Sequence, residues 1–124
     1  MAVQREIRFD IEFDNVDLTR AMVERQGERT QRKLQEIIDV YSFKIQREAQ
    51  LRAPVDTGFL RSSIIVDQVE PFYNEVIAGA DYAHFVEFGT RFTPAQPFMT
   101  PAAQSVVEDY HKDIQRALRW GWVR

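Results

Sequence analysis

Residues 34–54 read LQEIIDVYSFKIQREAQLRAP, and this stretch decides the fold. Its apolar side chains recur at steps of three and four, at Leu34, Ile38, Tyr41, Ile45 and Ala49. That spacing places them on one face of an α-helix, and such a face is buried against another element. Pro54 ends the helix, because the residue before a proline disfavours the helical conformation. The stretch therefore predicts an amphipathic helix packed on a core.

Towards the N-terminus the same helical pattern continues, but its side chains become polar. Between Val16 and Arg52 there is no proline, and the one glycine is Gly27. An unbroken helix over this span would be about 50 Å long. A compact domain of this size is only about 35 Å across. Either Gly27 breaks the helix, or the polar first half lies on another subunit.

Strands are predicted on both sides of this helix. An N-terminal strand is indicated by apolar residues that alternate with polar ones, at Ile7, Phe9, Ile11 and Phe13. Residues 62–69 and 74–78 form two further extended segments, and Pro71 lies between them. This arrangement predicts a β-hairpin.

The last third of the chain predicts two helices joined by a loop. Residues 81–88 read as a short helix that stops at Gly89. Three prolines make 88–101 an irregular loop. Thr100 as N-cap and Pro101 in the first turn then start a final helix. Its apolar face contains Ala103, Val107, Tyr110, Ile114 and Ala117.

These elements predict a single α+β domain over residues 1–124. An antiparallel sheet of about four strands packs against the long N-terminal helix and the C-terminal helix. Residues 1–14 form a strand arm that pairs within the subunit or with a neighbour, and residues 119–124 form a C-terminal tail. The sequence has no cysteine and no apolar run near 18 residues, which argues against thiolate metal sites and a membrane span.

Charge is distributed unevenly along the chain. The net charge is −3, but residues 54–110 carry eight acidic and two basic side chains, a net of −6. Nucleic-acid binding needs Lys and Arg for phosphate contacts, so this region is a poor binder of DNA. If it lines a passage, DNA slides past it without sticking.

Three segments occur in a fixed order: APVDTGFLRSSI at 53–64, YAHFVEFGT at 82–90 and PFMTPA at 97–102. Together they resemble the head–tail joining, or tail-completion, family of long-tailed bacteriophages of the HK type. The resemblance implies a virion structural protein of the neck, present in the host cytoplasm before assembly. It implies a hexameric ring whose neighbours are connector or stopper, tail-terminator and tail-tube proteins. It implies no catalysis and no cofactor, and DNA that passes through without specific binding.

Residues of these segments are expected to shape the subunit. Gly58 suits a turn that needs positive φ, and Leu60 seats the 54–61 loop on the core. Arg61 reaches a carboxylate, and Glu87 pairs with Arg61 or Arg91. The structural motif comprises Pro54, Asp56, Thr57, Gly58, Leu60, Arg61, Tyr82, Glu87, Phe88, Gly89, Pro97, Phe98 and Pro101.

A second group of residues is a candidate for contacts with sibling chains or partners. Arginines cluster on the first half of the long helix, aromatic residues lie in the proline-rich loop, and two tryptophans end the chain. Tryptophan is enriched among interface anchors. The candidates are Arg25, Arg29, Arg32, Phe92, Phe98, Trp120 and Trp122.

Two other classes of function compete with the phage interpretation. Asp56-Thr57-Gly58 is also the tripeptide of aspartic proteases, and short viral proteases pair one such Asp from each subunit of a homodimer. A long helix and Pro54 precede it here, whereas a protease needs an apolar strand. The other rival is a small adaptor unrelated to phages. With two histidines and no cysteine, no metal site is expected.

Overall fold

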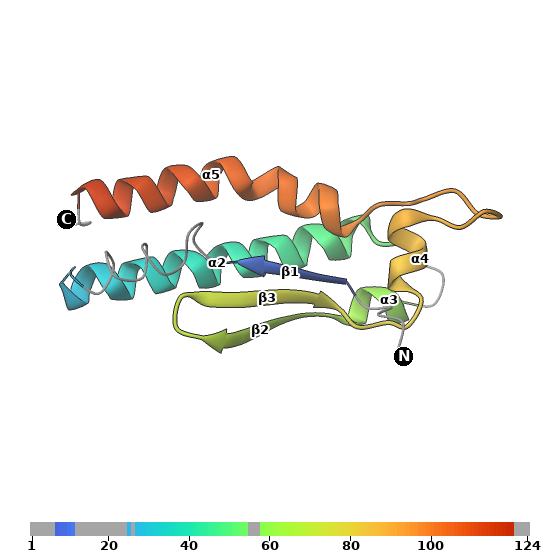
Figure 1. The fold of residues 1–124 in the computed structure, drawn as a ribbon, viewed down its shortest axis with the longest axis horizontal. Helices are drawn as coiled ribbons and strands as arrows, with labels where there is room; N and C mark the ends of the chain where they lie inside the picture. Colours follow the sequence, from blue (N-terminus) through green and yellow to red (C-terminus); the bar gives the residue numbers. More distant parts are fainter. Residues whose placement is uncertain (1–6, 12–24, 26, 55–57, 121–124) are drawn as a thin grey trace.

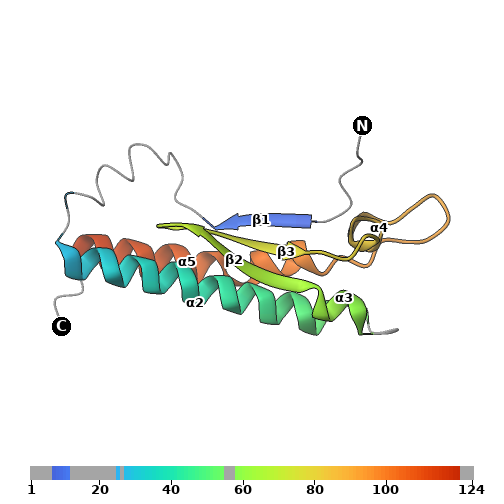
Figure 2. The same ribbon diagram turned by 90° about the horizontal axis from the view of Figure 1, so that it is seen from below.

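The computed structural model describes residues 7–11, 25, 27–54 and 58–120, with the backbone alone at residues 7–11 and at Trp120. A layer of two long helices lies against a layer formed by one β-sheet (Figures 1 and 2). In chain order the elements are β1 (Ile7–Ile11), α2 (Glu28–Arg52), α3 (Phe59–Ser62), β2 (Ile64–Glu70), β3 (Tyr73–Ala78), α4 (Ala83–Phe88) and α5 (Met99–Trp120).

The sheet is antiparallel, with strand order β1-β3-β2. Within the described residues it has three strands, and a fourth strand of the expected sheet is not shown. After Ala78 the described chain forms helices and an irregular loop and adds no further strand. β1 pairs with β3 of its own chain, in the register Ile7↔Ala78 to Ile11↔Asn74.

The helix predicted from residues 34–54 is present as α2. It begins at Glu28, and Gly27 before it has an extended conformation (φ −64°, ψ 156°). The helix is therefore not continuous through Gly27, and an unbroken helix from Val16 is excluded. Its apolar face is buried as the spacing predicts, including Leu34 and Ile38 at 0% exposure.

Two groups of core side chains lie along α2. The first half of α2 packs with the second half of α5, where the rings of Tyr41 and Tyr110 meet edge to face at 5.5 Å. The second half of α2 packs with the hairpin, α3, α4 and the start of α5. Because the two helices run side by side along the subunit, the core is long and narrow (Figure 1).

Side-chain hydrogen bonds hold the β2–β3 hairpin on α2. Phe72 in the turn has φ 65°, and its backbone N–H donates to the side chain of Gln35 at 2.8 Å. The buried amide of Asn74 donates to Asp39 at 2.9 Å and to Ser42 at 3.1 Å. These bonds show that the Asn74 side of β3 faces the helices.

The 54–61 segment was predicted to be a loop, but it contains the short helix α3. Gly58 precedes this helix with φ 80°, a left-handed conformation that glycine adopts at low cost. Leu60 is 3% exposed and belongs to the core. Asp56 and Thr57 lie outside the described residues.

Candidate assembly surface

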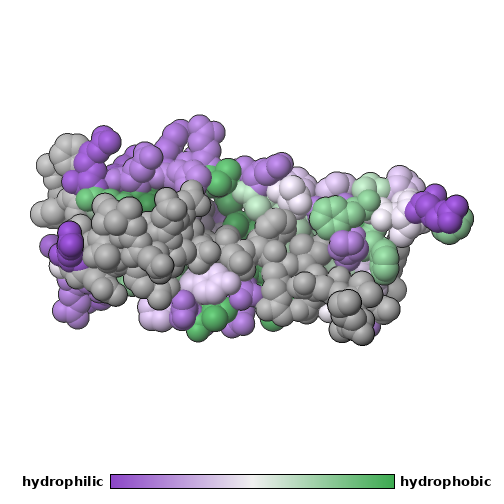
Figure 3. Space-filling view, viewed as in Figure 1, coloured by the Kyte–Doolittle hydropathy of each residue, from purple (hydrophilic) through white to green (hydrophobic). Residues whose placement is uncertain are grey.

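One end of the subunit carries an exposed group of aromatic side chains, here called the aromatic end. Both α3 and α4 lie at this end, and the 89–98 loop projects beyond them (Figures 1 and 2). In Figure 3 hydrophobic residues gather there beside a hydrophilic tip. Its members are more exposed than core aromatics: Phe59 57%, Tyr82 40%, Phe85 45%, Phe88 61% and Phe92 86%.

Ring contacts at the aromatic end join α3 to the start of α4 and link side chains within α4. Phe59 of α3 lies 6.3 Å from Tyr82, measured between ring centroids. His84 lies 5.9 Å from Phe85 and 4.9 Å from Phe88 by the same measure. These contacts order the surface side chains relative to one another.

Tyr82 and Phe88 were expected to hold the fold, but the structure places both at the surface. The spacing of Tyr82, Phe85 and Phe88 does put them on one side of a short helix, but that side faces outward. The helix α4 is anchored instead by Ala83 and Glu87, which are 0% and 2% exposed. Periodicity finds the face of a short helix but does not say whether the core lies beneath it.

Glu87 has a different role from the ion pair that was expected. Its carboxylate accepts hydrogen bonds from the backbone N–H groups of Phe98 at 2.9 Å, Met99 at 2.8 Å and Thr100 at 3.1 Å. These groups are donors of the first turn of α5, which have no partners within a helix. Among the described residues no ion pair joins Glu87 to Arg61 or Arg91. Thr100 is therefore not the N-cap, because α5 already begins at Met99 and a carboxylate from α4 caps it.

Arg61 is also placed differently from the expectation. Its side chain is half-buried, its Nε has no hydrogen-bond partner, and no described carboxylate forms an ion pair with it. The backbone carbonyl of Arg61 accepts a long hydrogen bond of 3.5 Å from Gln50 of α2. Within the described residues Arg61 thus helps to seat α3 on α2 through its backbone.

The 89–98 loop is constrained at its base and at its tip. Gly89 has φ 76° and ψ 176°, and a Cβ at this position would lie 2.7 Å from the backbone nitrogen of Ala95. The N–H of Gln96 donates to the carbonyl of Val86 at 2.8 Å. At the tip, the hydroxyl of Thr90 accepts from two backbone N–H groups, those of Phe92 and Thr93. The loop therefore presents the exposed ring of Phe92 on an ordered turn.

The two phenylalanines of this loop, both candidate contact residues, have opposite environments. Phe98 is 0% exposed and is one of the largest fully buried side chains. A partner cannot reach its side chain. The expectation that Phe98 contacts a partner was therefore wrong, because Phe98 is a core residue. Of the motif prolines, Pro97 is exposed, while Pro54 and Pro101 are half-buried.

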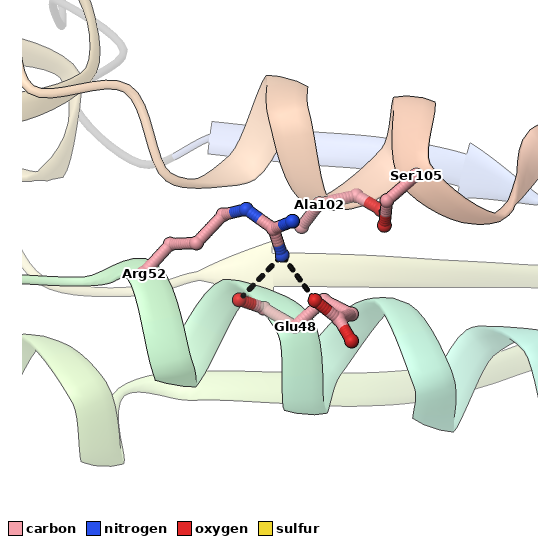
Figure 4. A network of polar contacts seen from close by, with 4 residues as sticks. All are labelled: Glu48, Arg52, Ala102 and Ser105. Carbon is pink, nitrogen blue, oxygen red and sulfur yellow. Dashed lines mark hydrogen bonds and ion pairs between the residues drawn. The ribbon is translucent and has the colours of Figure 1, made fainter.

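The opposite end of the subunit is basic. α2 starts and α5 ends there (Figure 1), and Arg25, Arg29 and Arg32 are exposed. Nothing is described of the side chain of Trp120, and Trp122 lies outside the described residues. At the other end of α2, Arg52 pairs with Glu48 one turn earlier, and both point towards Ala102 and Ser105 of α5 (Figure 4).

No arrangement typical of an active site occurs in the part of the chain that the structure describes. No group of three His, Asp or Glu side chains there is placed to hold a metal ion. The segment that leads to the Asp56 tripeptide is the helix α2 followed by Pro54. An aspartic protease needs an apolar strand at that place. No helix among the described residues is long and apolar enough to cross a membrane.

Acidic residues gather on the sheet. From residue 62 to residue 90 there are five acidic residues and no Lys or Arg. Strand register places two of them opposite each other, at Asp67↔Glu75, and pairs the backbone position of Asp10 in β1 with Glu75 on its other side. Like charges directly opposite one another destabilise a sheet. The sequence shows the charge bias, but only the register shows that these residues are neighbours.

Comparison with known proteins gives one family. The model of the family described as "Bacteriophage HK97-gp10, putative tail-component" matches residues 17–89, more than half of the chain. The match includes α2, α3, the hairpin and α4, and therefore most of the aromatic end. The search of curated proteins and the search of solved structures gave no match.

Proposed function

The chain belongs to the HK97-gp10-like family of bacteriophage tail components, and from this premise we propose that it is a structural subunit of the phage neck. Copies assemble into a hexameric ring that joins the head connector to the tail and leaves a channel for DNA. Membership of this family makes it a component of the virion and removes the alternative of an adaptor unrelated to phages.

The aromatic end is the observation that carries this proposal. Soluble monomers rarely expose large contiguous apolar patches, and those that occur mark interaction sites. Aromatic residues are enriched at protein interfaces. Ring contacts and the capped turn at Thr90 order this surface in advance, which lowers the entropic cost of binding. The neighbours that it fits are connector or stopper, tail-terminator or tail-tube proteins of the same virion.

A non-enzymatic role is part of the proposal. A structural tail component needs shape and contact surfaces, and Glu87, a deeply buried carboxylate, is occupied with capping α5. The competing protease would lose peptide cleavage in an Asp56→Asn variant. A neck subunit has no cleavage to lose, so that variant changes only stability or assembly.

A channel for DNA agrees with the charge of the chain. Residues 54–110 have a net charge of −6, which disfavours adhesion of a phosphate backbone. The passage is then a route that DNA crosses without specific binding. Lumen-facing residues that are mostly basic would contradict this part of the proposal.

The proposal is tested in the phage and in solution. Native mass spectrometry of the full chain should give a mass of six subunits, and electron cryo-microscopy should place the ring between head and tail. Inactivating the gene should leave filled heads and separate tails. Complementation with a Phe85→Ser/Phe92→Ser double variant should fail, whereas complementation with a Lys112→Ser variant should succeed. A particle that contains no copy of the chain refutes the proposal.

A further inference from the structure

The sheet has one face that no described helix covers. In Figure 2 both long helices lie on the same side of the sheet. Asn74 points towards those helices, and the register partners Ile65↔Ile77 and Asp67↔Glu75 belong to the opposite face, because alternate residues of a strand face opposite sides. On this face β2 exposes Ile65 (49%) and the charged Asp67.

Val69 extends this row, at the β-bulge between Gln68 and Glu70, and is 46% exposed. The exposed side of β2 thus reads apolar, acidic, apolar along the strand, and the exposed Glu70, paired with Tyr73, follows it. We call Ile65, Asp67 and Val69 the β2 row.

A second exposed row lies on α2. Phe43, Arg47 and Leu51 are four residues apart, so they follow one side of the helix. Phe43 is 51% exposed, Leu51 is 65% exposed, and Arg47 is exposed as well. This α2 row reads apolar, basic, apolar.

The two rows match in spacing and in charge. Four residues of helix advance about 6 Å, and two residues of strand advance about 6.6 Å. No ion pair of the described residues involves Arg47 or Asp67. We propose that the β2 row of one copy docks on the α2 row of the next copy, with Asp67 facing Arg47. This inference rests on the proposed function and names the contact that builds the ring.

The geometry of the subunit requires a second copy for this contact. Within one chain the α2 row lies on the helix layer, and the β2 row lies on the far side of the sheet, so they cannot meet. Each copy uses both rows, on different partners, and a contact of this kind repeats into a ring when its rotation closes. On this face Glu75 and Ile77 of β3 are buried at 9% and 7% exposure, so the docked helix covers the exposed β2 edge of the sheet. Asp67 then lies between subunits and does not line the DNA channel. The exposed Glu108 and Asp109 of α5 are the acidic residues that can line it.

Charge reversal tests the contact in the full-length chain. Asp67→Arg and Arg47→Asp should each weaken self-association at least about tenfold, because like charges then face each other. Combining both changes in one chain should restore the wild-type mass. Mixing the two single variants should give oligomers in which they alternate, with an even number of subunits. Asp109→Arg, an exposed acidic residue outside both rows, is the matched control.

Two outcomes of that experiment overturn the inference. One is a wild-type oligomeric mass for both single variants, and the other is a double variant as impaired as either single one. Circular dichroism of each variant verifies that its fold is intact. If the wild type assembles and the reversals change nothing, the contact is refuted and the neck function stands. If the wild type is absent from the particle, the proposed function itself fails.

Cross-linking extends the test to assembled particles. The chain has no cysteine, so an Arg47→Cys/Asp67→Cys variant offers one cysteine in each row. Oxidation should give a ladder of disulfide-linked subunits in denaturing gels. The two cysteines are the middle residues of their rows, so they meet whether the strand and the helix dock parallel or antiparallel. An Arg47→Cys/Asp109→Cys variant should give none. Particles that contain the first variant but show no ladder refute the contact.

Discussion

The carboxylate of Glu87 accepts a hydrogen bond of 2.8 Å from the backbone N–H of Met99, twelve residues later. Through this bond and two others, α4 caps the first turn of α5. The 89–98 loop lies between these two elements. The same carboxylate therefore fixes both ends of the loop that presents Phe92.

Removing this cap should destabilise the subunit. Glu87→Ala leaves two buried N–H groups and one half-buried N–H group without an acceptor, and we expect a loss of about 3 kcal/mol in the free energy of unfolding. Glu87→Gln keeps one carbonyl acceptor but not the charge that favours a helix N-terminus, and should lose about 1–2 kcal/mol. Urea unfolding measures both, with the exposed Glu108→Gln as control. Equal stability of Glu87→Ala and wild type would contradict the capping role.

Two glycines with positive φ should respond differently to alanine. Gly58→Ala meets no atom within 4 Å, so it should cost only the backbone strain of about 1 kcal/mol. Gly89 has a backbone conformation that only glycine adopts readily, and its Cβ would meet Ala95. Gly89→Ala should therefore cost about 3 kcal/mol or more. Thermal or urea unfolding of the two variants measures these losses of stability. A larger loss for Gly58→Ala than for Gly89→Ala would show that the 89–98 loop rearranges freely.

Replacing Phe98 and Phe92 by alanine compares the same substitution in the core and at the surface. Phe98→Ala opens a cavity and should lower the free energy of unfolding by about 3–5 kcal/mol. Phe92→Ala should change it by no more than about 0.5 kcal/mol, but should impair joining of heads to tails. Urea unfolding and a plaque assay with complementing variants separate the two effects. A stable, fully active Phe92→Ala variant would count against the aromatic end.

Tyr41 should make stability depend on alkaline pH. Burial raises the pKa of Tyr41 to about 12, and the hydrogen bond of 2.5 Å that its hydroxyl donates to Asp113 adds to this shift. The folded pKa then exceeds the unfolded value of 10.0. The stabilisation is complete below pH 10 and declines as the pH rises towards 12, because the unfolded chain loses this proton first.

A Tyr41→Phe variant provides the comparison for that prediction. It should be less stable than wild type at neutral pH, and this difference should shrink between pH 10 and pH 12. Urea unfolding at several pH values measures it, and absorbance titration of tyrosinate identifies the group. A difference that stays constant up to pH 12 would exclude the Tyr41–Asp113 bond as the cause.

Much of the secondary structure follows from the sequence, because the apolar periodicity of a helix and the effect of a proline depend only on neighbouring residues. The α2 face, the hairpin around Pro71 and the stop at Gly89 depend on residues within a few positions of one another. The three segments of the phage resemblance are also short local stretches of sequence, and the family match bears that resemblance out. The start of α5 was misplaced, because its cap comes from Glu87 in another helix.

The sequence by itself determined the α+β class, the main helical face and the family. Only the tertiary structure decided which aromatic residues are buried and which are exposed, since Phe92 and Phe98 are chemically identical and six residues apart. It also decided that Glu87 binds backbone N–H groups and that Asp67 and Phe43 lie on different layers. Local patterns fix which face of an element is apolar, whereas burial depends on the contacts that distant segments make once they pack.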